Sequence, residues 1–214
     1  VIWTTTPWTI PGNRAVAYGK DLEYDLINIE KTGEKSLAKK NDKIVIASEL
    51  KESVLNKIEV TDYTVIKSFL GKGLEGTVCE HPFKELGYDF DVRALEGDFV
   101  NLEQGTGIVH IAPGHGLDDY NLGIKNKIDI IQTLEDDGKY NHHAKGFEGE
   151  HVYKVDLKIA DKLKQLNKLL HLGTLRHSYP HSWRSKAPLV FRNTPQWFIS
   201  MEKRDLRNKA LKSI

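Results

Sequence analysis

Glycine residues interrupt positions 71–116 at short intervals, and this punctuation limits the fold more than any other feature of the sequence. The residues are Gly71, Gly73, Gly76, Gly87, Gly97, Gly105, Gly107, Gly114 and Gly116. Glycine at the ends of short strands allows tight turns and sharp bends. Short strands with such spacing favour a curved sheet or barrel over stacked βαβ units. We therefore predict an α+β fold with a β-barrel-like curved mixed sheet and flanking helices.

The remaining elements follow from residue type and apolar spacing. β-Branched and aromatic segments predict strands at residues 1–6, 13–18, 24–29, 43–47, 63–69 and 108–112. Helices are predicted after a cap at Ser48, near Leu117, and from Asp156 to a stop at Gly173. A last, basic amphipathic helix spans residues 201–214, where Leu206, Ala210 and Ile214 recur every four residues. Residues 1–200 are expected to form one domain, and the terminal helix is expected to dock against a neighbouring domain.

Charge and cysteine content exclude several classes of protein. The 214 residues carry a formal net charge of +1, so any contact with nucleic acid has to be local. The single cysteine, Cys79, excludes an intramolecular disulfide framework and a multi-cysteine zinc site. Apolar runs are too short to cross a bilayer, and the sequence begins at Val1 without a leader-like segment. These features predict a cytoplasmic piece of a longer protein, with no membrane contact.

The first chemically suggestive segment is threonine-rich and covers residues 3–13. In an extended strand, Thr4 and Thr6 face one side and Thr5 the other. β-Branching restricts each side chain, so a threonine wall can measure a small ligand and offer hydroxyls to it. An ordinary strand is the alternative, because threonine favours strands in general.

A second segment, residues 105–120, combines a histidine and a carboxylate near one turn. His110 lies near the end of a predicted strand, and Asp119 lies in the first turn of a predicted helix, where the helix dipole favours an anion. Gly105 and Gly107 would let a ligand approach the backbone. Together these groups could hold an ammonium group and a hydroxyl. The alternative is a core histidine beside ordinary helix-capping aspartates.

Residues 177–186 and 194–198 are rich in aromatic and polar side chains. His177 and His181 are spaced like metal ligands, but Pro180 disfavours the helix that would place both on one face. No cysteine or carboxylate lies nearby in the sequence. We therefore expect no metal site.

Taken together and in this order, the threonine-rich segment, the motif around His110, and the segments at 179–183 and 194–201 resemble the editing insertion of class I aminoacyl-tRNA synthetases of the isoleucyl type. His110 favours this type, because the valyl and leucyl relatives are expected to carry other residues there. The resemblance covers nearly the whole chain. It implies hydrolysis of Val-tRNA(Ile), the tRNA for isoleucine mischarged with valine.

The same resemblance implies a set of site residues. Catalytic roles fall on Thr5, Thr6, His110 and Asp119, with Asp119 holding the ammonium group of the amino acid. Substrate-binding roles fall on Thr4, Trp8, Asn13, Gly105, Gly107 and Tyr179, with Trp8 and Tyr179 as aromatic walls. ATP and Mg²⁺ would be used only by the absent synthetase domain, so no cofactor is expected here. The expected partners are the 3′ end of the tRNA and the rest of the parent synthetase, and the piece itself is expected to be monomeric.

Three other interpretations are also consistent with the sequence. A valyl-type editing domain would clear Thr-tRNA(Val) instead. A non-catalytic module would only dock the acceptor end of a tRNA. A purely structural barrel would leave the threonine-rich segment far from His110 and Asp119.

Overall fold

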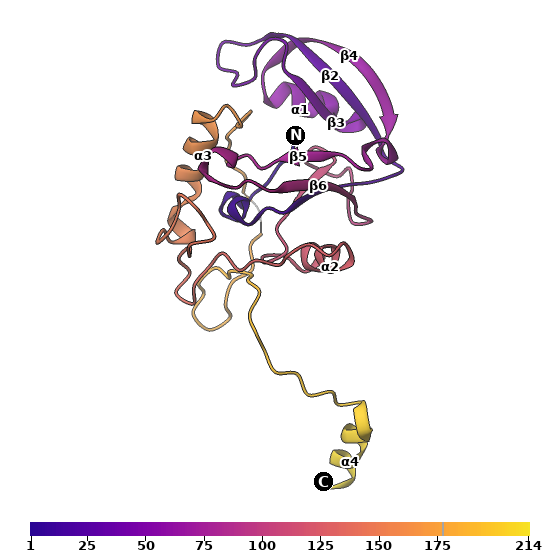
Figure 1. Cartoon of the computed structure of the whole chain (residues 1–214), viewed down its shortest axis with the longest axis vertical. Coiled ribbons are helices and arrows are strands. Elements are labelled where there is room, and N and C mark those ends of the chain that lie inside the picture. The colour runs from indigo at the N-terminus through magenta and orange to yellow at the C-terminus, as the bar shows by residue number, and fades with distance from the viewer. Residues whose placement is uncertain (177) are drawn as a thin grey trace.

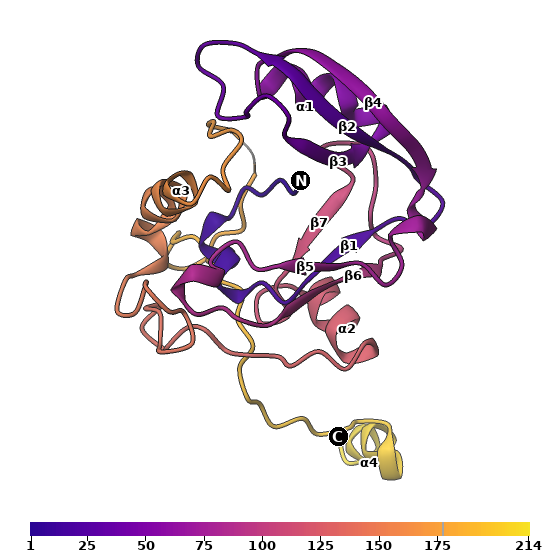
Figure 2. The same ribbon diagram turned by 45° about the horizontal axis from the view of Figure 1, so that its top comes forward.

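Two β-sheets form the centre of the chain in the computed structural model, which describes residues 1–176 and 178–214 (Figures 1 and 2). The first sheet has the strand order β5-β6-β1-β7. Its strands are β1 (Ala15–Tyr18), β5 (Val78–Glu80), β6 (Asp91–Glu96) and β7 (Ile108–Ile111). Strand β1 is parallel to β6 and antiparallel to β7, so the sheet is mixed as predicted.

The second sheet is antiparallel, with the order β3-β2-β4. Its strands are β2 (Glu23–Thr32), β3 (Lys43–Ala47) and β4 (Val60–Leu70), and α1 (Lys51–Lys57) lies against it. Val54 and Leu55 of α1 belong to the buried cluster that also holds the inward residues of β2 and β3.

The two sheets meet where Ala47 donates its amide to the carbonyl of Thr106 at 2.9 Å. The α+β prediction is confirmed, and the described strands form two sheets rather than a closed barrel.

The α-helices other than α1 are α2 (Leu117–Lys125), α3 (Asp156–Gln165) and α4 (Leu206–Lys212). Short 3₁₀ turns are η1 (Pro7–Gly12), η2 (Ser48–Leu50), η3 (Gly71–Leu74), η4 (Lys84–Leu86), η5 (Val152–Lys154) and η6 (Lys203–Asp205). The inner face of α3 packs with Trp8 and Ile10 of η1 in a second buried cluster, which brings the start of the chain to a helix far along the sequence.

The prediction of a strand at residues 1–6 is wrong. This segment forms no ladder with a described strand and leads into η1, although the Val1 amino group donates to the carbonyl of Val45 in β3 at 3.2 Å. The hydroxyl of Thr4 accepts the amide of Thr6 at 3.0 Å, so a local side-chain bond replaces a ladder bond. Pro7 lacks an amide hydrogen, and it occupies the first helical position of η1, where none is needed.

Two helix boundaries also differ from expectation. Ser48 does not cap a helix, because η2 begins directly after Ala47 without a side-chain capping bond. Helix α3 ends at Gln165 instead of continuing to Gly173. Asn167 has a φ of 55°, and a left-handed residue at this position stops the helix.

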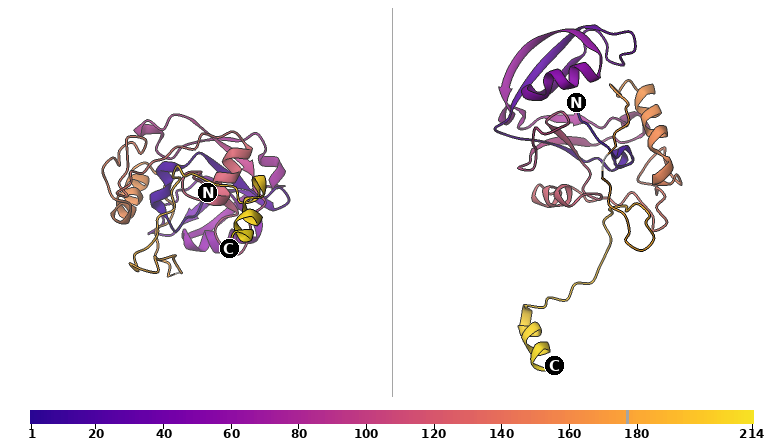
Figure 3. Two further views of the ribbon diagram at one scale, coloured as in Figure 1. Left: turned by 90° about the horizontal axis from the view of Figure 1, so that it is seen from below. Right: turned by 180° about the vertical axis from the view of Figure 1, so that it is seen from behind.

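The C-terminal segment leaves the body of the molecule (Figures 1 and 3). Arg204 and Asp205 have positive φ values, which separate η6 from α4, so the predicted helix begins at Leu206. The side chains of Leu206, Ala210 and Ile214 are all exposed. The domain boundary at residue 200 and the docking of α4 remain predictions. Within the described residues, no helix has both the length and the apolarity needed to span a bilayer.

Candidate active site

A cleft of about 380 Å³ opens between the first residues of the chain and the turn that follows β7. One side is formed by residues 3–6 and Thr9, and the other by parts of residues 99–119. The lining includes Thr4, Thr5, Thr6, Gly105, Gly107, His110 and Asp119. The threonine-rich segment and the motif around His110 therefore face one another, and a fold that keeps them far apart is excluded.

The threonine side of the cleft is ordered by its own hydroxyls. Thr4 Oγ1 lies 3.3 Å from Thr6 Oγ1, and the two side chains are adjacent through the local Thr4–Thr6 turn rather than through the predicted extended strand. Thr5 is exposed at the cleft, and its hydroxyl has no hydrogen-bond partner within the part of the chain that the structure describes. It is therefore available to a ligand or to water.

Asp119 supplies the negative charge of the cleft. It lies in the first turn of α2, and its Oδ2 accepts the amide of Ala112 at 2.7 Å. Burial raises the pKa of this carboxyl group, and the neighbouring Asp118 acts in the same direction. No lysine or arginine among residues 1–176 and 178–214 forms an ion pair with it. A cationic ligand group would therefore stabilise an otherwise unpaired carboxylate.

Glycine at position 116 allows this arrangement. A Cβ on Gly116 would lie 3.0 Å from Cγ of Asp119, so a larger residue would press on the carboxylate.

The imidazole of His110 is engaged at both nitrogens. Nδ1 lies 2.7 Å from Nδ2 of Asn13, and Nε2 lies 3.0 Å from the hydroxyl of Thr9. Asn13 Nδ2 also donates to the carbonyl of Ala15 at 2.9 Å, which fixes the orientation of the amide. Nδ1 therefore accepts, and Nε2–H donates to the Thr9 hydroxyl, which itself donates to the carbonyl of Thr6 at 2.9 Å.

His110 is neutral at physiological pH. Burial, together with the neighbouring His115, lowers its pKa to about 4. At neutral pH the ring carries one proton, and that proton is already donated to Thr9. His110 thus connects the strand β7 to the threonine segment through a chain of hydrogen bonds.

The two predicted binding glycines differ in their surroundings. Gly105 lines the cleft with a φ of +93°, and the nearest side chain to a Cβ there would be Trp3 at 3.6 Å. Gly107 has a φ of +76°, and a Cβ there would lie 2.4 Å from Cβ of Ala47. Its carbonyl accepts the hydroxyl of Tyr24 at 2.6 Å. The contact between the two sheets explains Gly107 without a ligand.

Three of the predicted binding residues do not line the cleft. Asn13 is 4% exposed and lies behind His110. Trp8 packs in the core, where its amide donates to Asp156 Oδ1 at 3.2 Å. Tyr179 lies in a separate loop and donates its hydroxyl to the carbonyl of Leu189 at 2.9 Å. The structure thus does not bring Trp8 or Tyr179 to the cleft as aromatic walls.

Sequence reasoning missed Trp3, Thr9 and His115, which also line the cleft. Thr9 reaches it because η1 turns the chain, and no helical turn was predicted there. His115 was visible only as part of the proline- and glycine-containing turn after β7.

No group of three or more histidine, cysteine or acidic side chains in the described residues could hold a metal ion. His177, one of the two histidines with ligand-like spacing, lies outside those residues. The ring Nδ1 of His181 is 2.7 Å from the carbonyl of Tyr179.

Several curated relatives of the chain carry the same name. The chain is 55% identical over 214 residues to an isoleucine–tRNA ligase of Pelagibacter ubique (strain HTCC1062), and the match covers 100% of this chain and 23% of that protein. It is 42% identical over 226 residues to the isoleucine–tRNA ligase of Gluconobacter oxydans (strain 621H), covering 100% of this chain and 24% of the relative. Over its whole length, the chain is homologous to one region of the isoleucine–tRNA ligases. This isoleucine–tRNA ligase region spans about a quarter of the length of these curated relatives.

Solved structures agree on the fold of this isoleucine–tRNA ligase region. The crystal structure titled GlLeuRS-CP1 matches with a TM-score of 0.58 at 15% identity, covering 80% of this chain and 83% of the other. The Plasmodium knowlesi cytosolic leucyl-tRNA synthetase editing domain matches with a TM-score of 0.58 at 11% identity, covering 77% and 80%. The region therefore has the fold of synthetase editing domains. No family model matches the chain.

Proposed function

We propose that this chain is the editing domain of an isoleucine–tRNA ligase and that it hydrolyses Val-tRNA(Ile). The observation that supports this most is the single cleft lined by Thr4 to Thr6, His110 and Asp119. A missing methylene changes binding by only about 1–3 kcal/mol, a limit for which isoleucine–tRNA ligases are themselves the standard example. Such a ligase therefore sometimes attaches valine to tRNA(Ile) and requires a second site that removes the valine.

Asp119 binds the α-ammonium group of the esterified valine. Its Oδ2 is held by the amide of Ala112, so the carboxylate has a fixed position when the substrate arrives. Burial disfavours the unpaired ionised form of Asp119, and an ammonium group restores it. This ion pair fixes the amino acid at one end of the cleft.

The threonine hydroxyls act on the other end. Thr5 offers an unpartnered hydroxyl, and Thr6 lies beside it with its hydroxyl 3.3 Å from that of Thr4. These groups order the attacking water and the ester carbonyl. An aminoacyl ester is activated, so orientation and hydrogen bonding supply the catalysis without a strong base.

His110 contributes position rather than a proton in this proposal. Both ring nitrogens are used by Asn13 and Thr9, and the ring is neutral at physiological pH. His110 and Thr9 both line the cleft, so their fixed side chains limit the length of the amino-acid side chain that enters. Valine fits this site, and isoleucine is excluded by its additional methylene.

The RNA end has to be single-stranded, because the terminal adenosine must reach the cleft. We propose that the rest of the ligase presents it, and that the chain itself uses no cofactor.

The direct test is a deacylation assay with the chain and three substrates. Val-tRNA(Ile) should be hydrolysed well above its spontaneous rate, whereas Ile-tRNA(Ile) should remain charged. Thr-tRNA(Val) tests the valyl-type alternative, since a site that requires a hydroxyl would prefer threonine. Stable binding of tRNA without any hydrolysis would instead indicate a docking module and would contradict the proposal.

A further inference from the structure

We propose that His115 is a positioning residue for the Asp119 carboxylate, acting through the turn of residues 112–116, and this inference rests on the proposed function. His115 lines the cleft but is not needed there as an acid or base. Both of its ring nitrogens are engaged by other segments of the chain. Nδ1 lies 3.1 Å from the carbonyl of Phe191, and Nε2 lies 2.8 Å from the hydroxyl of Thr133.

The turn itself carries the anchoring geometry of Asp119. The amide of His115 donates to the carbonyl of Ala112 at 2.8 Å, which closes the turn. The amide of Ala112 in turn donates to Asp119 Oδ2 at 2.7 Å. Any rotation of this turn moves the group that holds the carboxylate.

Two distant segments hold the turn in place. On one side, a Cβ at Gly114 would lie 2.8 Å from the carbonyl of Ile131, so the turn fits tightly against residues 131–133. On the other side, the amide of Asn193 donates to the carbonyl of Gly114 at 2.8 Å. His115 is the residue whose side chain contacts both segments, through Thr133 and Phe191.

The chemistry of the ring fits this bridging role. Because a carbonyl can only accept, Nδ1–H donates to Phe191, and the neutral ring leaves Nε2 to accept from the Thr133 hydroxyl. Burial lowers the pKa of His115 to about 4, which agrees with a neutral ring. The edge of Trp8 contacts the ring at a centroid distance of 5.1 Å. A Cβ at Gly12 would lie 2.9 Å from the ring, so little free space surrounds it.

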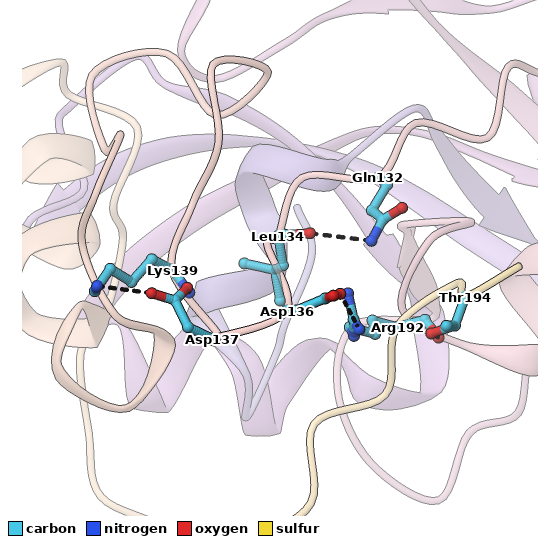
Figure 4. A network of polar contacts seen from close by, with 7 residues as sticks. All are labelled: Gln132, Leu134, Asp136, Asp137, Lys139, Arg192 and Thr194. Atoms are coloured by element: carbon cyan, nitrogen blue, oxygen red, sulfur yellow. Dashed lines mark hydrogen bonds and ion pairs between the residues drawn. The ribbon is translucent and has the colours of Figure 1, made fainter.

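The segment at residues 191–193 has a second contact with the region that follows Thr133. Arg192 Nη2 donates to Asp136 Oδ1 at 2.5 Å, and Figure 4 shows this pair beside Leu134 and Gln132. Beyond this segment the chain leaves the body and runs to α4 (Figure 3). The last anchored residues of the outgoing chain are therefore attached to the turn that orients the proposed catalytic carboxylate.

The test compares His115→Phe with the full chain of natural sequence. Phenylalanine keeps a ring against Trp8 but leaves the Phe191 carbonyl and the Thr133 hydroxyl without their partner. Amide hydrogen exchange at Ala112 and Asn193 should accelerate at least about tenfold. For Val-tRNA(Ile), kcat should fall at least about tenfold with KM changed less than about twofold, because the RNA contacts stay intact.

Two further variants keep the test informative if His115→Phe does not fold. Thr133→Val removes one hydrogen-bond partner of the ring, and Gly12→Ala displaces the ring without changing its chemistry. Both variants should show faster amide exchange and a lower kcat, each changed less than in His115→Phe. His143→Phe, on the exposed surface, is the matched control and should change neither measurement.

Several outcomes would overturn the inference. One is normal protection of Ala112 and Asn193 in the variants. A second is a fall in kcat while these amides stay protected, since His115 would then act on the substrate directly. A rise in KM alone would also overturn it. Absence of hydrolysis by the natural chain would instead defeat the proposed function, and the exchange data would still decide whether His115 holds the turn.

Discussion

The side-chain amide of Asn13 donates to Nδ1 of His110 over 2.7 Å, although the two residues are 97 positions apart. This bond selects the neutral tautomer with its proton on Nε2, and that proton is donated to Thr9. Asn13 therefore determines how the imidazole faces the cleft without lining the cleft itself. The predicted binding role of Asn13 is better described as control of His110.

Replacing Asn13 with alanine should release the His110 ring. Nδ1 loses its donor, so both tautomers become accessible and the link to Thr9 weakens. We expect hydrolysis of Val-tRNA(Ile) to fall roughly tenfold, because the walls of the cleft are no longer fixed. Histidine ¹⁵N chemical shifts report the tautomer directly. A pure Nε2–H ring in Asn13→Ala would contradict this account, and Asn28→Ala in β2 is a matched control.

Asp119→Asn tests the charge of the cleft without changing its shape. The asparagine carbonyl can still accept the amide of Ala112, but it cannot form an ion pair with an ammonium group. Loss of a charged hydrogen bond should lower kcat/KM for Val-tRNA(Ile) by roughly 10- to 150-fold. The neighbouring Asp118→Asn is the control, since that side chain is exposed. Equal activity of the two variants would remove Asp119 from the mechanism.

Three histidines with lowered pKa values should make the fold sensitive to acid. Burial lowers the pKa of His81 to about 3 and that of His110 and His115 to about 4. In the unfolded chain these rings take up protons near pH 6.5, whereas the folded chain resists protonation. The free energy of unfolding should therefore be highest above pH 6.5 and should fall as the pH decreases towards 4. Each ring contributes up to about 1.4 kcal/mol per pH unit.

Denaturant titrations between pH 7.5 and 4.5 measure this dependence. His81 is the useful site for a variant, because it lies outside the cleft and stacks on Tyr88 at 4.4 Å. His81→Phe removes one titrating ring and should reduce the slope, even if it lowers stability at all pH values. An unchanged slope in this variant would show that His81 does not contribute.

Gly107→Ala should destabilise the fold strongly. The added methyl group would lie 2.4 Å from Cβ of Ala47, and the residue has a φ of +76°. Overpacking and left-handed strain together should cost about 2–5 kcal/mol. Gly149→Ala is a matched control, because its φ is +77° but no atom lies within 4 Å of the new Cβ. Thermal unfolding separates the two terms, and equal losses in both variants would rule out the steric one.

Local pattern was sufficient for most of the sheet structure. Strand β3 occupies the residues predicted for it, because residues 43–47 are a short β-branched and apolar run. The same reasoning failed at residues 1–6, which form no ladder although the Val1 amino group donates to the carbonyl of Val45 in the edge strand β3 at 3.2 Å. The bond between Thr4 and the amide of Thr6 depends on the local backbone path, which composition does not encode. Helix α3 also ended earlier than predicted, because Asn167 adopts a left-handed backbone conformation that composition does not specify.

The site was predictable only in part. The segments holding Thr6, His110 and Asp119 were expected to meet because of their resemblance to a family, and spacing alone left that question open. Trp8 was misplaced because an aromatic side chain near a site can equally belong to the core. His115 escaped notice because both of its partners, Thr133 and Phe191, come from irregular segments whose positions depend on tertiary packing.

The central position of β1 has a consequence for how the molecule folds. Ala15 is in register with Arg93 on one side and with Ile111 on the other, so neither neighbour of this strand is close in sequence. Long-range pairing of this kind slows folding, because a large loop must close, with a loss of chain entropy, before the stabilising contacts can form. During synthesis, β1 can pair on both sides only after the ribosome has released β7. The proposed hydrolytic site is therefore assembled late, after the local β2–β3 hairpin of the other sheet can form.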